Sequence, residues 1–488
     1  MKPAITLFLL TLLPLLPFNG FANHPRDQWL STDQIIADTQ LAQETYERIH
    51  PGYDRYTDAQ TLNTAWDQII QQAKTNKGMR LGDYYLKLSE TLALMRCDHT
   101  KAELPKALAD ARGTTPVYLP FRWQMIENEV VVLRATADSG LKLGDVITHI
   151  DGQAIGDRID QLYRYVPTDG FTDHSKINAI ASSSEHRGGA LDHFGAMLWP
   201  HSSQVNIHYL DQQGQSQEKS MARINYSAWK KLGGSQRRNF IDAVEFKQVD
   251  DRTGYLKIDT FVNYRIPIKP DKLFDPIFKQ LQQNPSQRLI LDLRENGGGS
   301  SEPRQRLLAH LMPNKFRPVK DVRIKTLNLD GLREHLFTWE KSALKPKASK
   351  FNQNDDGSYS FKPHVLKATK WIKPDKRAFT GQLIVLTSRN NSSGSTNLLA
   401  VLTGRPNTTF VGEPTGGSME GPTAGILFFL KLPASGITTR VPIFRQYNDV
   451  AQFEPGMGLS PDVAASQNKQ DLLNGIDTIL QAAIDLSE

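Results

Sequence analysis

The stretch that most constrains the fold runs from Leu383 to Leu402, LIVLTSRNNSSGSTNLLAVL. An apolar run over 383–386 is followed by a cluster of Ser, Asn and Gly residues, and a helical pattern of leucines starts directly after that cluster. This order predicts a strand, a tight turn and a helix. A serine in such a turn projects at the C-terminal edge of a sheet, and the backbone N–H of the next residue points towards any anion that forms there.

Ser393, which Gly394 follows, is the candidate nucleophile in this turn. The turn also has a plainer interpretation, in which Ser392, Ser393 and Ser395 only compete to cap the helix. The turn alone leaves both interpretations open, so the rest of the chain has to decide between them.

The N-terminus differs from the rest of the sequence. The chain has 488 residues, 39% hydrophobic and 23% charged, which is typical of a globular protein with more than one domain. Its first residues are different: Lys2 precedes an apolar stretch from Ala4 to Phe18, and Gly20 and Ala22 supply small residues shortly afterwards. This pattern predicts a secretory signal peptide over 1–22, cleaved after Ala22. We therefore expect an exported protein, periplasmic or secreted.

Charge and cysteine content narrow the possible partners. Removal of Lys2, the only charged residue of the predicted signal, lowers the formal net charge from +6 to +5, and no basic cluster follows. A nucleic-acid partner is therefore not expected. No later segment is apolar enough to predict a membrane span. The single cysteine, Cys97, cannot form an intramolecular disulfide.

Residues 23–110 are expected to form an N-terminal helical domain. Thr32 is the expected cap of a first helix that runs towards Ile49. A later helix is predicted to end near Cys97–Thr100, which places His99 at a helix C-terminus, where the helix dipole favours the protonated ring. Taken alone, the local sequence favours a plain helix-terminal histidine. The apolar faces of the second and third helices are expected to comprise Leu62, Trp66 and Ile69, and Tyr85, Leu88, Leu92 and Met95.

Residues 111–228 change to short strands and turns. The stretch Ser139–Gln153 resembles a PDZ domain through its pattern "GL..GD.I..I.G". That resemblance implies a groove in which an extended peptide adds a strand and backbone N–H groups hold its C-terminal carboxylate. A helical insertion over 157–198 is predicted to interrupt the module. The alternative is a small β-module that only spaces its neighbours.

Residues 239–488 alternate between strand and helix patterns, which predicts an α/β domain with a largely parallel sheet covered on both faces. The loop Asp292–Ser300 contains Gly297, Gly298 and Gly299 before a helix, so its backbone can approach a substrate closely and donate N–H groups. A phosphate loop is not indicated, because no Gly-Lys-Ser/Thr follows. A polar, lysine-rich insertion over 330–380, with a hairpin turn at 356–357, is the candidate for a lid.

Five motifs occur in the order and spacing of one known family: GYLKIDTF, LILDLRENGGGS, LIVLTSRNNSSGS, TFVGEPTGGS and GLSPDV. In these motifs the chain resembles the tail-specific, or C-terminal processing, serine proteases, whose members also carry a PDZ module. The resemblance implies a ClpP/crotonase-like β/α catalytic domain that cleaves peptide bonds in proteins without a cofactor. It assigns the nucleophile to Ser393 and the oxyanion hole to the N–H groups of Gly394 and of Gly298 or Gly299.

The base of the reaction is where the sequence departs from the better-known branch of this family. That branch uses a lysine that closes a "GE.T.GK" motif, but Ser418 stands at that position here, and no lysine occurs between Lys376 and Lys431. A serine hydroxyl needs a base to become a nucleophile. The sequence therefore resembles the tricorn-core branch, in which a histidine from the region before the PDZ module is the base. His99, in CDHT, matches that histidine, and Glu454 is nearest to the supporting glutamate of the branch.

The other histidines compete weakly with His99. Three of them, His186, His193 and His364, lie in insertions and are expected at the surface. No HExxH motif, CxxC pair or clustered His/Asp/Glu spacing indicates a metal. The sequence thus predicts an exported serine endopeptidase acting on proteins or peptides, and the PDZ resemblance implies that their C-termini are recognised. The alternatives are a catalytically inactive PDZ-type peptide-binding scaffold and, with less support, a carrier of apolar ligands.

Overall fold

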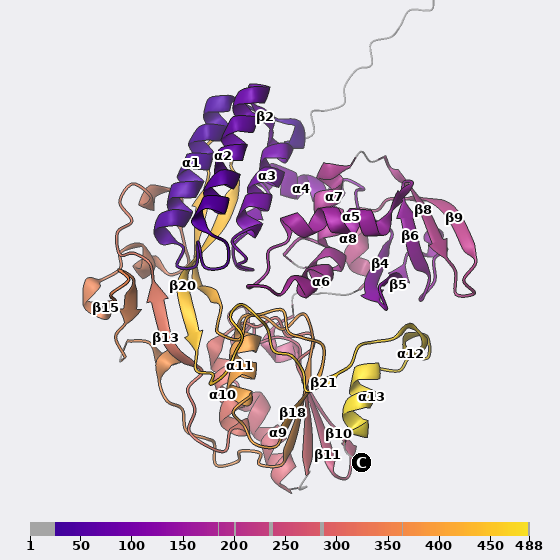
Figure 1. The fold of residues 1–488 in the computed structure, drawn as a ribbon. Coiled ribbons are helices and arrows are strands. Elements are labelled where there is room, and N and C mark those ends of the chain that lie inside the picture. The colour runs from indigo at the N-terminus through magenta and orange to yellow at the C-terminus, as the bar shows by residue number, and fades with distance from the viewer. Residues whose placement is uncertain are drawn as a thin grey trace, which may run out of the picture.

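The computed structural model describes residues 25–183, 185–199, 202–233, 238–283, 287–363 and 365–486. The predicted signal peptide over 1–22 and His364 lie outside the described residues. Figure 1 shows the N-terminal helices above the C-terminal sheet, with the β-module of the middle of the chain beside those helices.

Three helices form the N-terminal region: α1 (Thr32–Ile49), α2 (Ala59–Asn76) and α3 (Leu81–Ala93). The short strands β1 (Trp29–Leu30) and β2 (Met79–Arg80) pair beside them. Ser31 caps α1 through a reciprocal capping box with Gln34, so the cap lies one residue before the predicted Thr32. Helix α3 ends at Ala93, and His99 therefore lies in a loop beyond the helix rather than at its C-terminus.

The middle of the chain forms an antiparallel sheet in the order β4-β5-β6-β8-β9, with β7 paired to β6. The strands are β4 (Phe121–Ile126), β5 (Glu129–Ala135), β6 (Val146–Ile150), β7 (Gln153–Ala154), β8 (Gln204–Leu210) and β9 (Ser216–Ala222). The helices here are α4 (Lys106–Thr114), α5 (Ile155–Leu162), α6 (Lys176–Ala181), α7 (Ala190–Leu198) and α8 (Tyr226–Lys231). A helical insertion between β7 and β8 agrees with the sequence pattern.

The insertion bears on the predicted peptide groove. Strand β4 is an edge of the sheet, the kind of place where a peptide can add as a further strand. Helix α6 packs against this strand. Just before β4, the backbone N–H of Leu119 donates to the buried carboxylate of Asp192 on α7 at 2.8 Å. A carboxylate of the chain itself therefore occupies one backbone donor near this edge, and PDZ-type binding remains a prediction.

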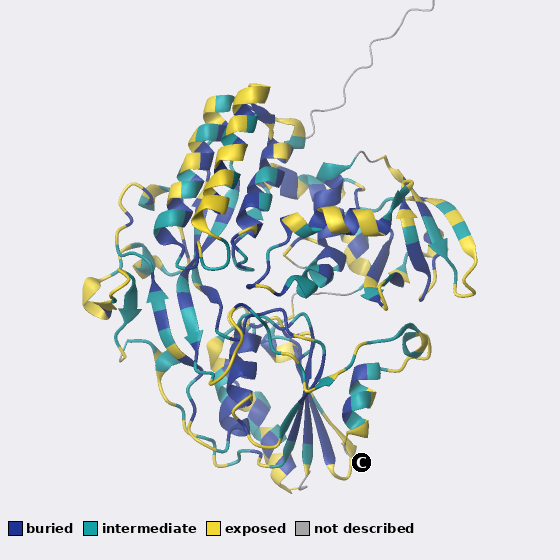
Figure 2. Cartoon of the chain, viewed as in Figure 1, coloured by how far each residue is buried: buried dark blue, intermediate teal, exposed yellow. Residues whose placement is uncertain are grey.

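The C-terminal sheet has the strand order β10-β11-β12-β17-β18-β21, parallel throughout except for β10. Its strands are β10 (Val244–Asp250), β11 (Thr253–Ile258), β12 (Arg288–Asp292), β17 (Gln382–Thr387), β18 (Thr408–Gly412) and β21 (Val463–Ala464). Helices α9 (Asp271–Gln283), α10 (Ser301–Leu311) and α11 (Gly394–Leu402) cover one face, and α13 (Thr478–Asp485) covers the other. Figure 2 shows the central strands as buried. The predicted α/β class is confirmed.

A second sheet connects this domain to the N-terminal helices, in the order β14-β19-β20-β13-β16-β15. Its strands are β13 (Val319–Ile324), β14 (Leu336–Phe337), β15 (Phe351–Gln353), β16 (Tyr359–Phe361), β19 (Thr423–Lys431) and β20 (Thr438–Asn448). Strands β14, β15 and β16 come from the 330–380 insertion, and the predicted turn at 356–357 joins β15 to β16. The insertion is therefore built into a sheet, which differs from a free lid.

The N-terminal helices are docked on this second sheet. Strand β3 (Ala102–Glu103) pairs with β20. The hydroxyl of Tyr46 donates to the carbonyl of Arg440 at 2.8 Å. One apolar cluster runs from the N-terminal helices through the β-module to β19 and β20. The apolar core therefore continues across the predicted domain boundaries at residues 110 and 239. Among the described residues, no helix is long and apolar enough to cross a membrane.

Candidate active site

Ser393 lies at the predicted elbow between β17 and α11. Its backbone has φ 53° and ψ −119°, a conformation that residues other than glycine rarely adopt. Although Ser393 occupies the N-cap position of α11, its side chain makes no capping hydrogen bond. The capping interpretation of this serine is therefore not what the structure shows. The strained elbow turns the Ser393 hydroxyl away from its own helix.

The Ser393 hydroxyl points to His99. The distance between His99 Nε2 and Ser393 Oγ is 3.2 Å, although 294 positions separate the two residues in the chain. This is a hydrogen-bond distance, within the range expected for a nucleophile and its base before substrate binds. The structure thus brings together two residues that sequence reasoning had paired.

The loop that carries His99 is held from two sides. On one side, the thiol of Cys97 donates to the carbonyl of Thr423 at 3.4 Å. On the other side, His50 Nε2 contacts Thr100 Oγ1 at 3.0 Å. His50 Nδ1 accepts from the backbone N–H of Gly52, so its proton lies on Nε2, and this ring donates to Thr100. These buried contacts fix the imidazole of His99 relative to the sheet.

Asp98 supplies the acidic partner of His99. Its Oδ1 lies 2.5 Å from His99 Nδ1, close enough for an ion pair, although the two atoms are not aligned as a hydrogen bond. Its other oxygen accepts from the hydroxyl of Ser392. Burial alone would lower the pKa of His99, but the Asp98 carboxylate outweighs burial and raises that pKa above the ordinary histidine range. With Nδ1 held by Asp98, Nε2 is the nitrogen that faces Ser393.

Glu454 is not placed where the sequence predicted it. The residue is exposed, and none of the interactions recorded among the described residues joins it to His99. A half-buried glutamate on this side of the site is Glu420, which pairs with Arg55 and accepts from the backbone N–H of Gly456 at 3.1 Å. The prediction that Glu454 orients His99 is corrected to Asp98, because a carboxylate adjacent in sequence already occupies the Nδ1 side of the ring.

A buried carboxylate, Asp169, lies close enough to Asp98 and His99 to interact with them electrostatically. It accepts from the backbone N–H of Ser418 at 3.1 Å. Burial and the negative charge of Asp98 raise the pKa of Asp169 well above its usual range. Its neighbour Thr172 donates to the carbonyl of Gly416 at 2.8 Å. The insertion of the β-module therefore packs directly against the loops that surround Ser393.

The glycine loop after β12 lies beside the elbow. A Cβ on Gly298 would lie 2.6 Å from Gly394 N, and one on Gly394 would lie 3.1 Å from Gly299 N. Gly298 has φ 107° and Gly299 has φ 134°, both in the region that favours glycine. The N–H of Gly298 already donates to Asn296 Oδ1 at 2.9 Å. For the N–H groups of Gly299 and Gly394, no acceptor is recorded among the described residues.

Because the N–H of Gly298 is already engaged and that of Gly299 is free, Gly299 is favoured as the oxyanion donor that acts together with Gly394. Asn391 fixes their spacing, since its amide donates to the carbonyls of Leu293 and Asn296 at 2.6 and 3.1 Å. One buried side chain thus ties the elbow to the glycine loop. A serine, a histidine with a carboxylate, and two free N–H groups together are equipped for acyl transfer.

The remaining candidates of the sequence lie elsewhere or serve other contacts. Ser418, at the position of the lysine of the other branch, is buried, and its hydroxyl lies 3.4 Å from that of Tyr56. His186 and His193 are buried rather than exposed, which corrects the prediction of surface positions. They pack against each other, and His193 Nε2 contacts Tyr85 OH at 3.0 Å.

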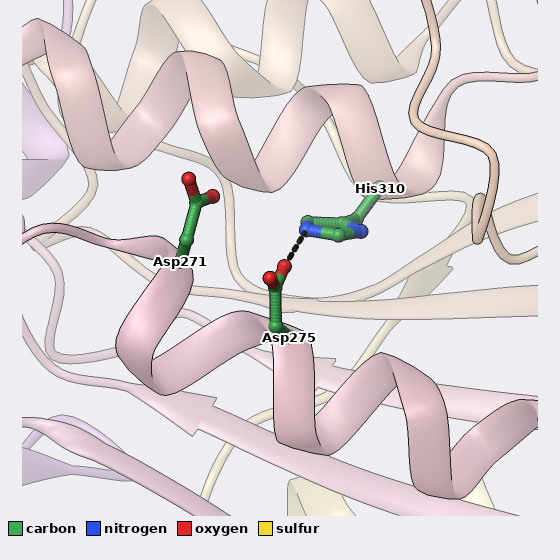
Figure 3. A group of neighbouring side chains, drawn as sticks. All are labelled: Asp271, Asp275 and His310. Carbon is green, nitrogen blue, oxygen red and sulfur yellow. Dashed lines mark ion pairs between the residues drawn. The ribbon is translucent and has the colours of Figure 1, made fainter.

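One group of described residues has the side-chain types to hold a metal ion: Asp271 and Asp275 of α9 and His310 of α10 (Figure 3). Both carboxylates already pair with guanidinium groups, Asp271 with Arg306 and Asp275 with Arg377. Burial lowers the pKa of His310 to about 4, so this ring is neutral. The neighbouring arginines therefore balance the charge of the two carboxylates, and we assign no metal ion to Asp271, Asp275 and His310.

Sequence reasoning missed Asp98, Asp169 and the contacts of the insertion. Asp98 stands next to His99 in CDHT, so a carboxylate beside the candidate base was the available signal. Asp169 reaches the site from a segment whose sequence carries no motif, and only the packing of the insertion reveals it.

Comparisons with known proteins concern the family and the fold of the chain. Residues 252–465 match the sequence model described as Peptidase family S41. No curated protein matches the sequence significantly. The fold is similar to that of mature CPAF complexed with lactacystin, with 15% identity, a TM-score of 0.64, and coverage of 93% of this chain and 97% of that chain. A second structure of mature CPAF gives 15% identity, a TM-score of 0.61, and coverage of 90% and 94%.

The likeness to CPAF concerns the fold, whereas the sequence match concerns the family. The matched residues include both the glycine loop and Ser393. The chain therefore contains a peptidase family S41 domain over residues 252–465, in agreement with the tail-specific proteases that its five motifs resemble, and the protein is a serine peptidase.

Proposed function

We propose that the protein is an exported serine endopeptidase in which Ser393 is the nucleophile, His99 the general base and Asp98 the residue that orients the base. The single observation that carries this proposal is the 3.2 Å distance between His99 Nε2 and Ser393 Oγ. The absence of a lysine between 376 and 431 supports histidine rather than lysine as the base, as in the tricorn-core branch.

The reaction follows from the positions of these groups. Neutral His99 takes the Ser393 proton at Nε2 as Oγ attacks the scissile carbonyl. The carbonyl oxygen becomes an oxyanion that accepts from the N–H groups of Gly299 and Gly394. The imidazolium, stabilised by Asp98, then donates its proton to the leaving amine. A water molecule then attacks the acyl-enzyme while His99 takes its proton. His99 returns this proton to Ser393 Oγ as the second product leaves.

Recognition of substrate C-termini has less support than the chemistry. It rests on the PDZ resemblance, while α6 packs against β4 and the carboxylate of Asp192 accepts the hydrogen bond of the Leu119 N–H. We therefore place the recognition of protein or peptide substrates at the active site itself. Export is proposed from the sequence of 1–22 alone.

The test uses a fluorophosphonate probe, which phosphonylates an activated serine: the serine oxygen attacks phosphorus and fluoride leaves. Wild-type protein should be labelled at Ser393, and Ser393→Ala should be neither labelled nor active in cleaving unfolded protein. The thermal unfolding midpoint of Ser393→Ala should stay within about 2 °C of wild type, because this hydroxyl caps no helix. Labelling at another serine, or wild-type protein that resists the probe, would support the inactive scaffold instead.

A further inference from the structure

Arg304, in the first turns of α10, is a buried cation without a partner. The residue is 5% exposed. Its Nε atom is fully buried with no acceptor, and no hydrogen bond or ion pair of its guanidinium is recorded among the described residues. Burial is the only cause that acts on its pKa, which it lowers to about 10, so no nearby carboxylate offsets the loss of water. A buried guanidinium in this state is costly unless an anion joins it.

Other buried arginines of this chain show how such a charge is normally satisfied. Arg405 is also almost fully buried, and burial likewise lowers its pKa to about 10. Its guanidinium, however, donates to the carbonyls of Leu311, Phe379 and Gly381 at 2.7 to 2.9 Å. Arg405 therefore has a structural role within the chain, whereas Arg304 has an unused set of donors.

The guanidinium of Arg304 lies next to the oxyanion donors. Its Nη1 is 2.7 Å from the point that a Cβ on Gly394 would occupy, and Gly299 N is 3.1 Å from the same point. Helix α11 begins at Gly394 and α10 begins at Ser301, and neither helix has a side-chain cap at its N-terminus. The positive ends of two helix dipoles and an unpaired guanidinium thus meet beside Ser393.

We propose that Arg304 determines the specificity of this site by binding a carboxylate of the substrate next to the scissile bond. The inference rests on the proposed function of Ser393. The carboxylate can come from an Asp or Glu side chain flanking the bond, or from a free C-terminus one or two residues beyond it.

The experiment compares matched fluorogenic peptides that carry Glu or Gln at each position flanking the bond, and peptides with free or amidated C-termini. Wild type should prefer one carboxylate-bearing peptide by about 30-fold or more in kcat/KM. Arg304→Met should lose this preference and cleave the Gln or amide peptide within about threefold of wild type. The position at which the preference occurs distinguishes the side-chain source from the terminal one.

The neighbouring arginine provides a matched control. Arg306 lies on the same helix but pairs with Asp271 and Asp375, so Arg306→Met should lower the thermal unfolding midpoint and keep the Glu/Gln ratio. Arg304→Met should not lower that midpoint, because it removes an unpaired buried charge. An unchanged ratio in Arg304→Met, or an equal loss on both peptides, would overturn the proposal, the second outcome indicating an oxyanion role.

A binding measurement separates this inference from the proposed function. Ser393→Ala should bind the fluorescein-labelled Glu or free-carboxylate peptide more tightly than its neutral match, and Ser393→Ala with Arg304→Met should bind the two equally. This readout needs no turnover. If Ser393→Ala also bound the charged and the neutral peptide equally, the role of Arg304 would be overturned even with Ser393 confirmed as the nucleophile.

Discussion

The two halves of the candidate site are held in different ways. Ser393 is positioned by its own backbone, in a strained turn between a buried strand and a buried helix. His99 lies in a loop beyond α3 and is positioned by contacts with distant residues, among them Thr423 and, through Thr100, His50. The nucleophile is therefore a local feature of the sequence, whereas the base depends on the docking of the N-terminal helices onto the second sheet.

Ser393 and His99 therefore differ in what can displace them. Local strain at Ser393 persists as long as the α/β core is folded, because α11 and β17 belong to that core. The position of His99 can be lost by partial opening between the N-terminal helices and β20, which need not unfold the core. The comparison can be tested by changing each half separately.

The largest effect is expected from the carboxylate beside the base. Asp98→Asn should lower kcat by about 10³-fold or more, because the imidazolium formed during acylation loses its counter-ion. Asp98 raises the pKa of His99, so the wild-type base becomes neutral only at higher pH. The acid limb of the kcat/KM profile should therefore move to lower pH in Asp98→Asn. The measurement is kcat/KM from pH 5 to 10; an acid limb that does not move would exclude His99 as the titrating base.

The next largest effect is expected in the glycine loop, which belongs to the half of the site that is positioned by local backbone structure. Gly299→Ala should lower kcat by about 10²-fold and also destabilise the protein, since its Cβ would lie 2.4 Å from the carbonyl carbon of Phe261 and φ is 134°. Gly331→Ala is the control, because its φ is also positive but its Cβ would meet open space. That variant should lose about 1 kcal/mol of stability and keep its activity. Equal kinetics in the two variants would remove Gly299 from the oxyanion hole.

The docked half is tested at Asp38 of α1. Its buried carboxylate accepts from the N–H groups of Ala434 and Ser435 at 3.0 and 2.8 Å. Asp38→Asn leaves one acceptor for two donors and should cost about 1 to 3 kcal/mol. Fluorophosphonate labelling should then fail at a lower temperature than the unfolding of the α/β core, measured by hydrogen exchange of β17. Asp33→Asn, exposed on the same helix, should leave both transitions in place.

The same division explains what the sequence could predict. The strand, elbow and helix around Ser393 follow from patterns within twenty residues, and the parallel sheet follows from alternating apolar runs. The contact of His99 with Ser393 was predicted only through the family resemblance, because no local pattern spans such a separation. Asp169 and Arg304 could not be predicted as site residues, since their surroundings are set by packing between segments far apart in the chain.

The smallest effect is expected at Glu454. This side chain is exposed and has no recorded contact with His99, so Glu454→Gln should change kcat/KM by less than about twofold. Glu420→Gln is the informative counterpart, because the half-buried Glu420 is paired with Arg55 and the buried Arg445, and the change removes the carboxylate charge that balances both guanidinium groups. That variant should lower the unfolding midpoint by several degrees, as measured by differential scanning fluorimetry beside the kinetics. A loss of more than tenfold in Glu454→Gln at an unchanged midpoint would mean that Glu454 reaches the site when substrate binds. The base would then be supported by two carboxylates, one adjacent in sequence and one brought by the loop of 451–456.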